Sequence, residues 1–201
     1  MRKSEKNYPR TETRKQKLLS VLQQRQPDLT LILDNIHDPH NVSAIYRSCD
    51  AFGISEVHLC YTDTPFPELA KKTSASARKW VETKRHASAD NVVNELLDNN
   101  YQILATSFNK NARPLRQWNF LQPTAIILGN EHAGVRNELL KKATGELYIP
   151  MHGLIQSFNV SVAAAIILAE AARQREDAGW YDYSRVRQEE LEKKYNQWLR
   201  K

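Results

Sequence analysis

The sequence predicts an α/β protein with a mainly parallel β-sheet that is covered by helices on both faces. Segments typical of strands alternate with segments typical of helices along most of the chain. The strand segments are continuous apolar runs, which is typical of strands buried on both faces of a parallel sheet. With 201 residues, the chain is most simply one domain that can bury a substantial core.

Five segments are predicted strands, because each is a short apolar run bounded by turn-forming residues. They are residues 29–35, 56–61, 101–107, 124–130 and 146–150. Ligands of such sheets bind beyond the carboxyl ends of the strands. The segments that follow these runs are therefore the first place to search for a site.

Six segments are predicted helices, from their apolar spacing and from residues that begin or end helices. They are residues 11–25, 41–53, 88–100, 136–143, 159–172 and 184–200. Asn41 stands at the expected N-cap of the second helix, and Gly53 closes that helix. In the third helix four apolar residues are expected to face inward: Val92, Val93, Leu96 and Leu97.

The composition excludes several classes of protein. No run of about 18 apolar residues is present, so a membrane span is not expected. The first residues lack the apolar region of a secretory signal. Cys49 and Cys60 have no histidines at ligand spacing, so no metal is expected, and the chain has the composition of a cytoplasmic protein with free thiols.

The charge distribution indicates a polyanionic partner. The net charge is +6 and the isoelectric point is about 9.3. Residues 2–17 hold seven basic side chains against two glutamates. The seven are Arg2, Lys3, Lys6, Arg10, Arg14, Lys15 and Lys17.

Three strand ends are followed by polar segments. After the first strand, Arg47 emerges from an otherwise apolar helix, where it is either a surface cation or a group whose planar fork binds phosphate. After residues 124–128 come Gly129, Asn130 and Glu131, and after 146–150 come several amide and hydroxyl side chains. Neither a phosphate-binding loop motif nor a nucleophile–base motif is present. The residues alone predict a polar ligand site at three strand ends.

The three segments together resemble the motifs of the SPOUT superfamily of S-adenosylmethionine-dependent RNA 2'-O-methyltransferases. They read "LDNIHDPHNVSAIYRSCDAFGI", "IILGNEHAGV" and "IPMHGLIQSFNVSVAAAIILAEAARQR". The resemblance runs from about Arg25 to Tyr181. It implies a homodimer and a deep C-terminal trefoil knot, which apolar periodicity cannot reveal. It also implies three parts: a basic N-terminal helical extension (1–25), a knotted methyltransferase domain (26–180) and a C-terminal helix (181–201).

Site residues follow from the resemblance, position by position. The implied catalytic residues are Arg47, Asn41, Glu131, Ser157 and Asn159. The methyl donor, S-adenosylmethionine, is expected to lie against Thr106, Gly129, Ile149, Met151 and Phe158. The expected RNA contacts are Lys15, Lys17, Arg173 and Arg175. Tyr46 and Phe158 depart from the usual aliphatic residues of the family, but neither change removes a catalytic group.

The residues of two motifs favour one branch of the superfamily. "NVSAI" and "IQSFNVS" stand where ribosomal RNA methyltransferases typically have "NLGAI" and "VESLNVS". This favours the TrmH branch, which methylates the ribose of guanosine 18 in the D-loop of tRNA. The alternatives are a 23S rRNA ribose methyltransferase and a non-catalytic RNA-binding protein. The role of Arg47 stays open between an activated base and a cation that stabilises the developing alkoxide.

Overall fold

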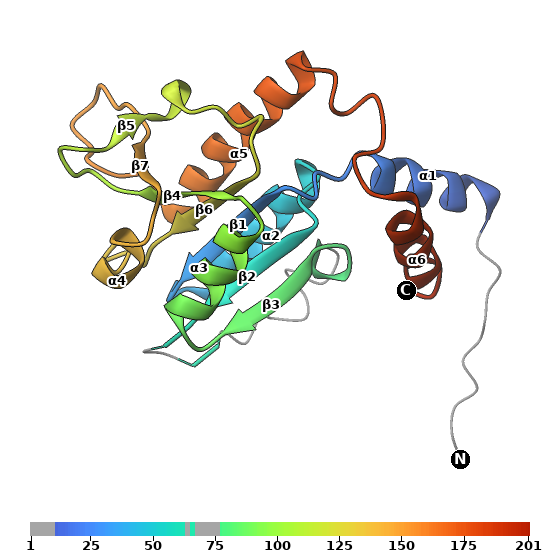
Figure 1. Cartoon of the computed structure of the whole chain (residues 1–201), viewed down its shortest axis with the longest axis horizontal. Coiled ribbons are helices and arrows are strands. Elements are labelled where there is room, and N and C mark those ends of the chain that lie inside the picture. The colour runs from blue at the N-terminus through green and yellow to red at the C-terminus, as the bar shows by residue number, and fades with distance from the viewer. Residues whose placement is uncertain (1–10, 63–64, 67–76) are drawn as a thin grey trace.

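The seven strands of the computed structural model form one parallel sheet, in the order β3-β2-β1-β6-β4-β7-β5 (Figure 1). The structure describes residues 11–62, 65–66 and 77–201. The strands are β1 (Leu29–Asp34), β2 (Glu56–Cys60), β3 (Glu82–His86), β4 (Gln102–Thr106), β5 (Arg113–Pro114), β6 (Thr124–Leu128) and β7 (Gly145–Tyr148). The five predicted strands are confirmed, apart from one or two residues at their ends.

Six α-helices occupy the described part of the chain. They are α1 (Glu12–Gln23), α2 (Pro39–Ala51), α3 (Ala89–Asp98), α4 (Asn137–Leu140), α5 (Val160–Asp177) and α6 (Gln188–Leu199). The described residues also form two short 3₁₀ helices, η1 (Ala77–Lys79) before β3 and η2 (Leu115–Gln117) before β6. No described helix is long and apolar enough to cross a membrane.

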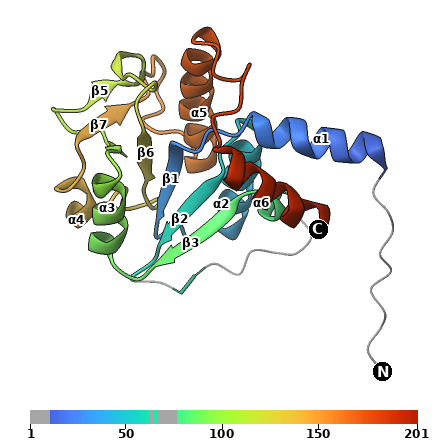
Figure 2. The same ribbon diagram turned by 45° about the vertical axis from the view of Figure 1, so that its right-hand side comes forward.

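The first and last helices pack against each other beside the sheet rather than on it (Figure 2). Leu18 and Leu22 of α1 and Leu191 and Trp198 of α6 form a small apolar cluster of their own. Trp198 also contacts Trp80, with ring centroids 4.7 Å apart, which attaches the pair to the rest of the molecule. The basic first helix is thus held at one end of the fold.

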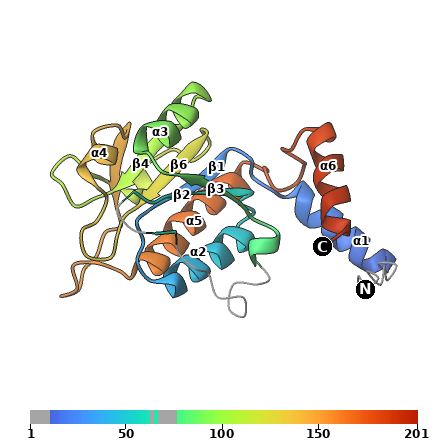
Figure 3. The same ribbon diagram turned by 90° about the horizontal axis from the view of Figure 1, so that it is seen from below.

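The sheet is the middle of three layers, with α2 and α5 on one face and α3 and α4 on the other (Figure 3). Successive strand residues point to opposite faces. Leu31 and Leu33 of β1 therefore join the cluster under α2 and α5, whereas Ile32 joins the cluster under α3. All of β1 and β6 is buried, as expected for central strands.

Two strands were not predicted from the sequence. β3 has the sequence ETKRH, which offers no apolar run, and it lies at the edge of the sheet, where its side chains are mostly exposed. β5 is only two residues long and lies at the other edge. The expectation that Leu97 faces inward is wrong, because the residue lies near the end of α3 and is 40% exposed.

The position of Arg175 contradicts another expectation. The sequence predicts that it faces RNA, but its side chain is 0% exposed. Its guanidinium donates to Asp28 Oδ1 at 2.6 Å, to the carbonyl of Phe120 at 3.0 Å and to Gln26 Oε1 at 3.1 Å. The prediction that Arg175 contacts RNA is therefore wrong, because this arginine fastens the end of α5 to the start of the sheet.

Candidate active site

Two of the three motif segments meet at the carboxylate of Glu131, which follows β6. Its Oε2 accepts a hydrogen bond from the backbone N–H of His37 at 3.1 Å. Its Oε1 accepts from the N–H of Asp38 at 3.4 Å and from Asn41 Nδ2 at 2.7 Å. Because β1 and β6 are neighbours in the sheet, the loops that follow them leave the same edge. Glu131 therefore fixes the entrance of α2.

The third segment joins this network through Asn159. Asn159 Nδ2 donates to Asn41 Oδ1 at 3.0 Å. Its own Oδ1 caps α5 by accepting from the backbone N–H of Ser161 at 2.9 Å. Asn41 is thus the link between the two other side chains. It does not cap α2 as predicted; Asp38 does, by accepting from the N–H of His40 at 2.8 Å.

The electrostatics of Glu131 favour the charged carboxylate. Partial burial alone would raise its pKa. The hydrogen bond from Asn41 and the backbone N–H groups outweigh burial and hold the pKa of Glu131 below its ordinary value. A carboxylate with a lowered pKa is a weak base, so the geometry favours a positioning role for this group.

The loop after β6 leaves no room for a side chain at Gly129. A Cβ there would lie 2.1 Å from the backbone carbonyl carbon of Gly134. The loop is closed by two hydrogen bonds between the backbones of Asn130 and Gly134, at 3.0 and 2.9 Å. Asn130 Nδ2 also donates to the carbonyl of Asn35 at 2.8 Å, which fastens this loop to the first one.

Two asparagines without a predicted role, Asn35 and Asn130, also hold the loops of the site. Asn35 has a φ of 48°, a left-handed conformation that asparagine adopts more readily than most residues. Its side-chain oxygen accepts from the backbone N–H of Thr62 at 3.2 Å. Both asparagines lie within two residues of the end of a buried strand, and this position in the sequence could have indicated a role at the site.

Arg47 lies on α2, two turns beyond the hydrogen-bonded cluster. Its side chain is exposed and makes no hydrogen bond or ion pair with the described residues. Ser157 is also exposed and makes no hydrogen bond with them. The structure therefore joins Asn41, Glu131 and Asn159 directly, whereas Arg47 and Ser157 remain available to a substrate.

A hollow of about 420 Å³ opens beside β7, within the size range of small-molecule sites. Its lining residues are Phe108, Tyr148, Ile149, Met151, Ile155 and Gln156. Ile149 and Met151 are among the five predicted donor contacts, whereas Phe108, Tyr148 and Ile155 had not been predicted. The mixture of apolar side chains with one amide suits a nucleoside that carries a sulfonium.

The other three predicted donor contacts, Thr106, Gly129 and Phe158, do not line this hollow. Thr106 ends β4, Gly129 follows β6, and Ile149 follows β7. These three strands are adjacent in the sheet, so the three positions share one edge. The Thr106 hydroxyl donates to the carbonyl of Ile127 at 3.1 Å, and Phe158 is partly exposed.

The other predicted RNA contacts have surface positions. Lys15 pairs with Glu12 at 2.7 Å, and Lys17 is exposed. Arg173 is exposed and pairs with Glu170 at 2.8 Å and with Asp177 at 2.6 Å. Four of the basic residues predicted to attract a polyanion, Arg2, Lys3, Lys6 and Arg10, lie outside the described residues.

Comparison with protein families identifies the class of protein that carries this site. The model of the SpoU rRNA Methylase family matches residues 28–169, which include all three motif segments up to the middle of α5. The chain belongs to this family. The resemblance seen in the sequence is thereby confirmed.

Individual methyltransferases are also similar to this chain. The tRNA (guanosine(18)-2'-O)-methyltransferase of Thermus thermophilus is 43% identical over 96% of this chain and 98% of its own. The solved TrmH/SpoU tRNA modifying enzyme of A. aeolicus is 35% identical and superimposes with a TM-score of 0.88, covering 94% of this chain and 96% of that one. An AdoMet-bound rRNA methyltransferase from Sinorhizobium meliloti is 27% identical, with a TM-score of 0.64 over 77% of this chain and 59% of its own.

Proposed function

We propose that this protein transfers a methyl group from S-adenosylmethionine to the ribose 2'-hydroxyl of guanosine 18 in the D-loop of tRNA. The observation that carries the proposal is the near full-length similarity to an enzyme named for this reaction. The geometry supports it, since a network that joins three motif segments lies at the same sheet edge as a nucleoside-sized hollow. The similarity to the rRNA methyltransferase covers a smaller share of both chains.

The donor fits the residues that surround the hollow. S-adenosylmethionine supplies an activated methyl group on a sulfonium. Ile149 and Met151 offer apolar contacts, and Thr106, Gly129 and Phe158 complete the expected binding region. The absence of a side chain at Gly129 lets a ligand approach the backbone closely. No metal is needed for this transfer.

Alignment is the main contribution expected of the protein. Aligned reactants can lower a barrier by about 7–11 kcal/mol in favourable cases. Glu131, Asn41 and Asn159 hold the loops that bring the two substrates together. Ser157 and Arg47 remain available to contact the ribose and its phosphates.

The proton of the 2'-hydroxyl is the second requirement. Glu131 is a weak candidate base, because its hydrogen-bond donors lower its pKa. Arg47 is the group proposed for this step, either as a base activated by bound RNA or as a cation that stabilises the developing alkoxide. The lysine substitution described in the Discussion distinguishes these roles.

The dimer is part of the proposal. Leu154 is fully exposed and Ile155 is 74% exposed, and Phe158 and Val162 are 42% and 45% exposed. An apolar surface of this kind is typical of an interface between proteins. We propose that it packs against a second copy of the chain, as in a homodimer of SPOUT enzymes, with the chain after β7 in a trefoil knot.

The RNA-binding surface and the domain division also follow from the family. Lys15, Lys17 and Arg173 are the proposed contacts to tRNA phosphates, and Arg175 is excluded by its burial. Residues 1–25 and 181–201 are proposed as accessory segments on a methyltransferase domain of residues 26–180. A tRNA-modifying enzyme of this type works in the cytoplasm.

The test is methyl transfer from radiolabelled S-adenosylmethionine to purified tRNA and to 23S rRNA, followed by mapping of the labelled nucleotide. We expect label in the tRNA D-loop. Label in rRNA alone would support the ribosomal alternative. Absence of label in both RNAs, with RNA binding retained, would support the non-catalytic alternative.

A further inference from the structure

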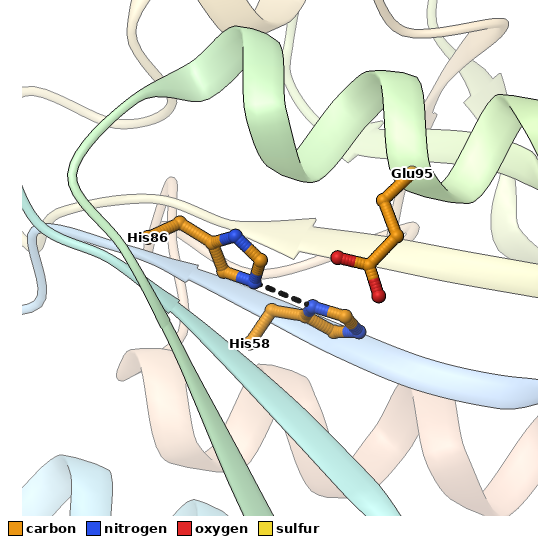
Figure 4. Close-up of side chains that lie close together, drawn as sticks. All are labelled: His58, His86 and Glu95. Carbon is orange, nitrogen blue, oxygen red and sulfur yellow. Dashed lines mark hydrogen bonds between the residues drawn. The ribbon is translucent and has the colours of Figure 1, made fainter.

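Two histidines and a glutamate converge under α3, away from the proposed catalytic network (Figure 4). His58 lies on β2, His86 ends β3, and Glu95 lies on α3. A hydrogen bond of 2.9 Å joins His58 Nδ1 and His86 Nε2, and a carboxylate oxygen of Glu95 completes a group of atoms that all lie within 4.8 Å of one another. Three ligand atoms this close are a prerequisite for binding one metal ion.

The register of the sheet explains why these side chains meet. His58 pairs with Lys84, and Cys60 pairs with His86, so the two histidines lie diagonally on neighbouring strands. Residues two apart on a strand point to the same face. Both rings therefore project toward α3, which brings Glu95 over them. The two histidines are 28 positions apart in the sequence, which hides this arrangement from a search by sequence spacing.

The position of His58 is well suited to metal ligation. Its side chain is 1% exposed. Its Nε2 lies 3.2 Å from Glu56 Oε1, although the angles do not meet those of a hydrogen bond. A metal-binding histidine usually donates its second ring N–H to a carboxylate, so a small rotation of the ring would complete a familiar pair. The other nitrogen, Nδ1, faces His86.

His86 is the second histidine of the group. Its ring lies against that of His58, with the ring centroids 5.1 Å apart and the planes inclined by 26°. Its Nε2 therefore lies on the same side of the cluster as His58 Nδ1.

We propose that His58, His86 and Glu95 bind one divalent transition-metal ion of the Zn²⁺ type, at a site separate from methyl transfer. Zn²⁺ bonds of about 2.0–2.1 Å would place the two nitrogens about 3.3 Å apart, so the pair opens by only a few tenths of an ångström. The proton of the hydrogen bond between the two rings leaves the binding nitrogen, either to solvent or to the outer nitrogen of the same ring. Two imidazoles and one carboxylate favour Zn²⁺, Co²⁺ or Ni²⁺ over Mg²⁺ and Ca²⁺. Water fills the remaining position.

Lys84 competes with the metal. Its ammonium lies 2.6 Å from Glu95 Oε1 and 3.0 Å from Glu56 Oε1. The lysine side chain is 45% exposed and flexible, so the ammonium can move into solvent when a metal ion neutralises Glu95. Its removal should therefore tighten metal binding, which an accidental surface site would not show.

Metal binding would strengthen one edge of the fold. β3 is an edge strand that pairs only with β2. The ion would join β3 to β2 and to α3. A ligand that binds the folded state alone stabilises it, so the unfolding temperature should rise with metal concentration.

The experiment is a titration of the metal-free, full-length protein with CoCl₂, followed by visible absorption, and with ZnCl₂ in competition. We expect one ion per chain, with absorption typical of tetrahedral Co²⁺. His86→Gln and Glu95→Gln should weaken binding by at least about tenfold, a lower limit set by second-shell substitutions. Lys84→Met should tighten it. His152→Gln, at an exposed position outside the cluster, is the matched control and should leave it unchanged.

The same variants provide an independent measurement. Zn²⁺ should raise the unfolding temperature of the wild type and of His152→Gln, but not of His86→Gln. The proposal is overturned if the wild type binds no Co²⁺ or Zn²⁺ at one equivalent. It is also overturned if His86→Gln and Glu95→Gln bind as tightly as the wild type, or if Lys84→Met binds no more tightly.

Discussion

Arg47 is the residue on which the proposed chemistry depends most. It is a long cation on a helix that packs one side into the core, and it is exposed and without a described partner. We expect Arg47→Ala to lower the single-turnover rate by about 10²–10³-fold, as removal of one electrostatic donor typically does. Saturating tRNA and donor separate the chemical step from binding.

The Arg47→Lys variant decides between the two roles of this residue. Lysine keeps the charge but loses the planar fork. Appreciable activity would support a purely electrostatic role, whereas activity as low as that of alanine would support a role in geometry or basicity. An alanine variant with a wild-type rate would contradict the assignment of Arg47.

The contribution of Glu131 to stability should depend on pH. Its folded-state pKa lies below the ordinary value of 4.5, so the carboxylate stabilises the fold above that pH, and the effect is lost as pH falls through the lowered value. We expect Glu131→Gln to lose less stability than the wild type between pH 5 and pH 3. We also expect it to methylate more slowly, because the donors of Asn41, His37 and Asp38 lose their charged acceptor. Urea unfolding at several pH values checks the first expectation; equal acid dependence of the two proteins would contradict it.

At the scale of elements, α5 is anchored by a buried ion pair. Arg175 pairs with Asp28, which also accepts from Arg185 at 2.8 Å. Removing one member of a buried pair typically costs about 3–5 kcal/mol. We expect Arg175→Met to lie at the lower end of this range, because Asp28 keeps Arg185 as a partner. Urea unfolding measures the free energy.

Arg173 is the matched control for this variant. It lies two residues away, but its guanidinium is 58% exposed, and ion pairs of an exposed cation are worth no more than about 1 kcal/mol. We expect Arg173→Met to unfold almost as the wild type does, and to have a lower salt dependence of tRNA binding. Equal destabilisation by the two substitutions would contradict the structural assignment of Arg175.

The sequence predicted the buried elements well and the polar ones poorly. β1 and β6 are central, wholly buried and mostly apolar, so their pattern was unambiguous. β3 is an edge strand of polar residues, which local pattern cannot distinguish from a loop. Arg175 looked like a surface cation because its partner, Asp28, lies 147 residues away in the chain.

For the candidate site, the sequence predicted the residues but not the contacts between them. Motif resemblance indicated Asn41, Glu131 and Asn159, which the structure joins by hydrogen bonds. It did not indicate that Asn41 bonds both other residues, nor that Asn130 holds the first loop. These contacts depend on the order of parallel strands, which decides which loops become neighbours.

At the scale of the whole molecule, the proposed dimer depends on the exposed apolar side of α5 and the preceding segment. Val162 is 45% exposed near the start of α5. We expect Val162→Asp to convert a dimer into a monomer at micromolar concentration, because an unpaired charge would be buried in the interface. Sedimentation velocity measures the change.

Leu97→Asp is the matched control, because Leu97 is 40% exposed on α3, on the opposite face of the sheet. It should leave the dimer intact. A wild-type protein that sediments as a monomer would contradict the proposed assembly, and so would dissociation by both substitutions.

The most direct test of the proposed function is methyl transfer to a tRNA that carries 2'-deoxyguanosine at position 18. The substitution removes the proposed acceptor oxygen and leaves the base and the rest of the tRNA unchanged. A tRNA with one 2'-deoxynucleotide at position 17 serves as the control. We predict that the control is methylated once per molecule and that the tRNA with dG18 accepts no methyl group. Equal methylation of the two tRNAs would contradict the account.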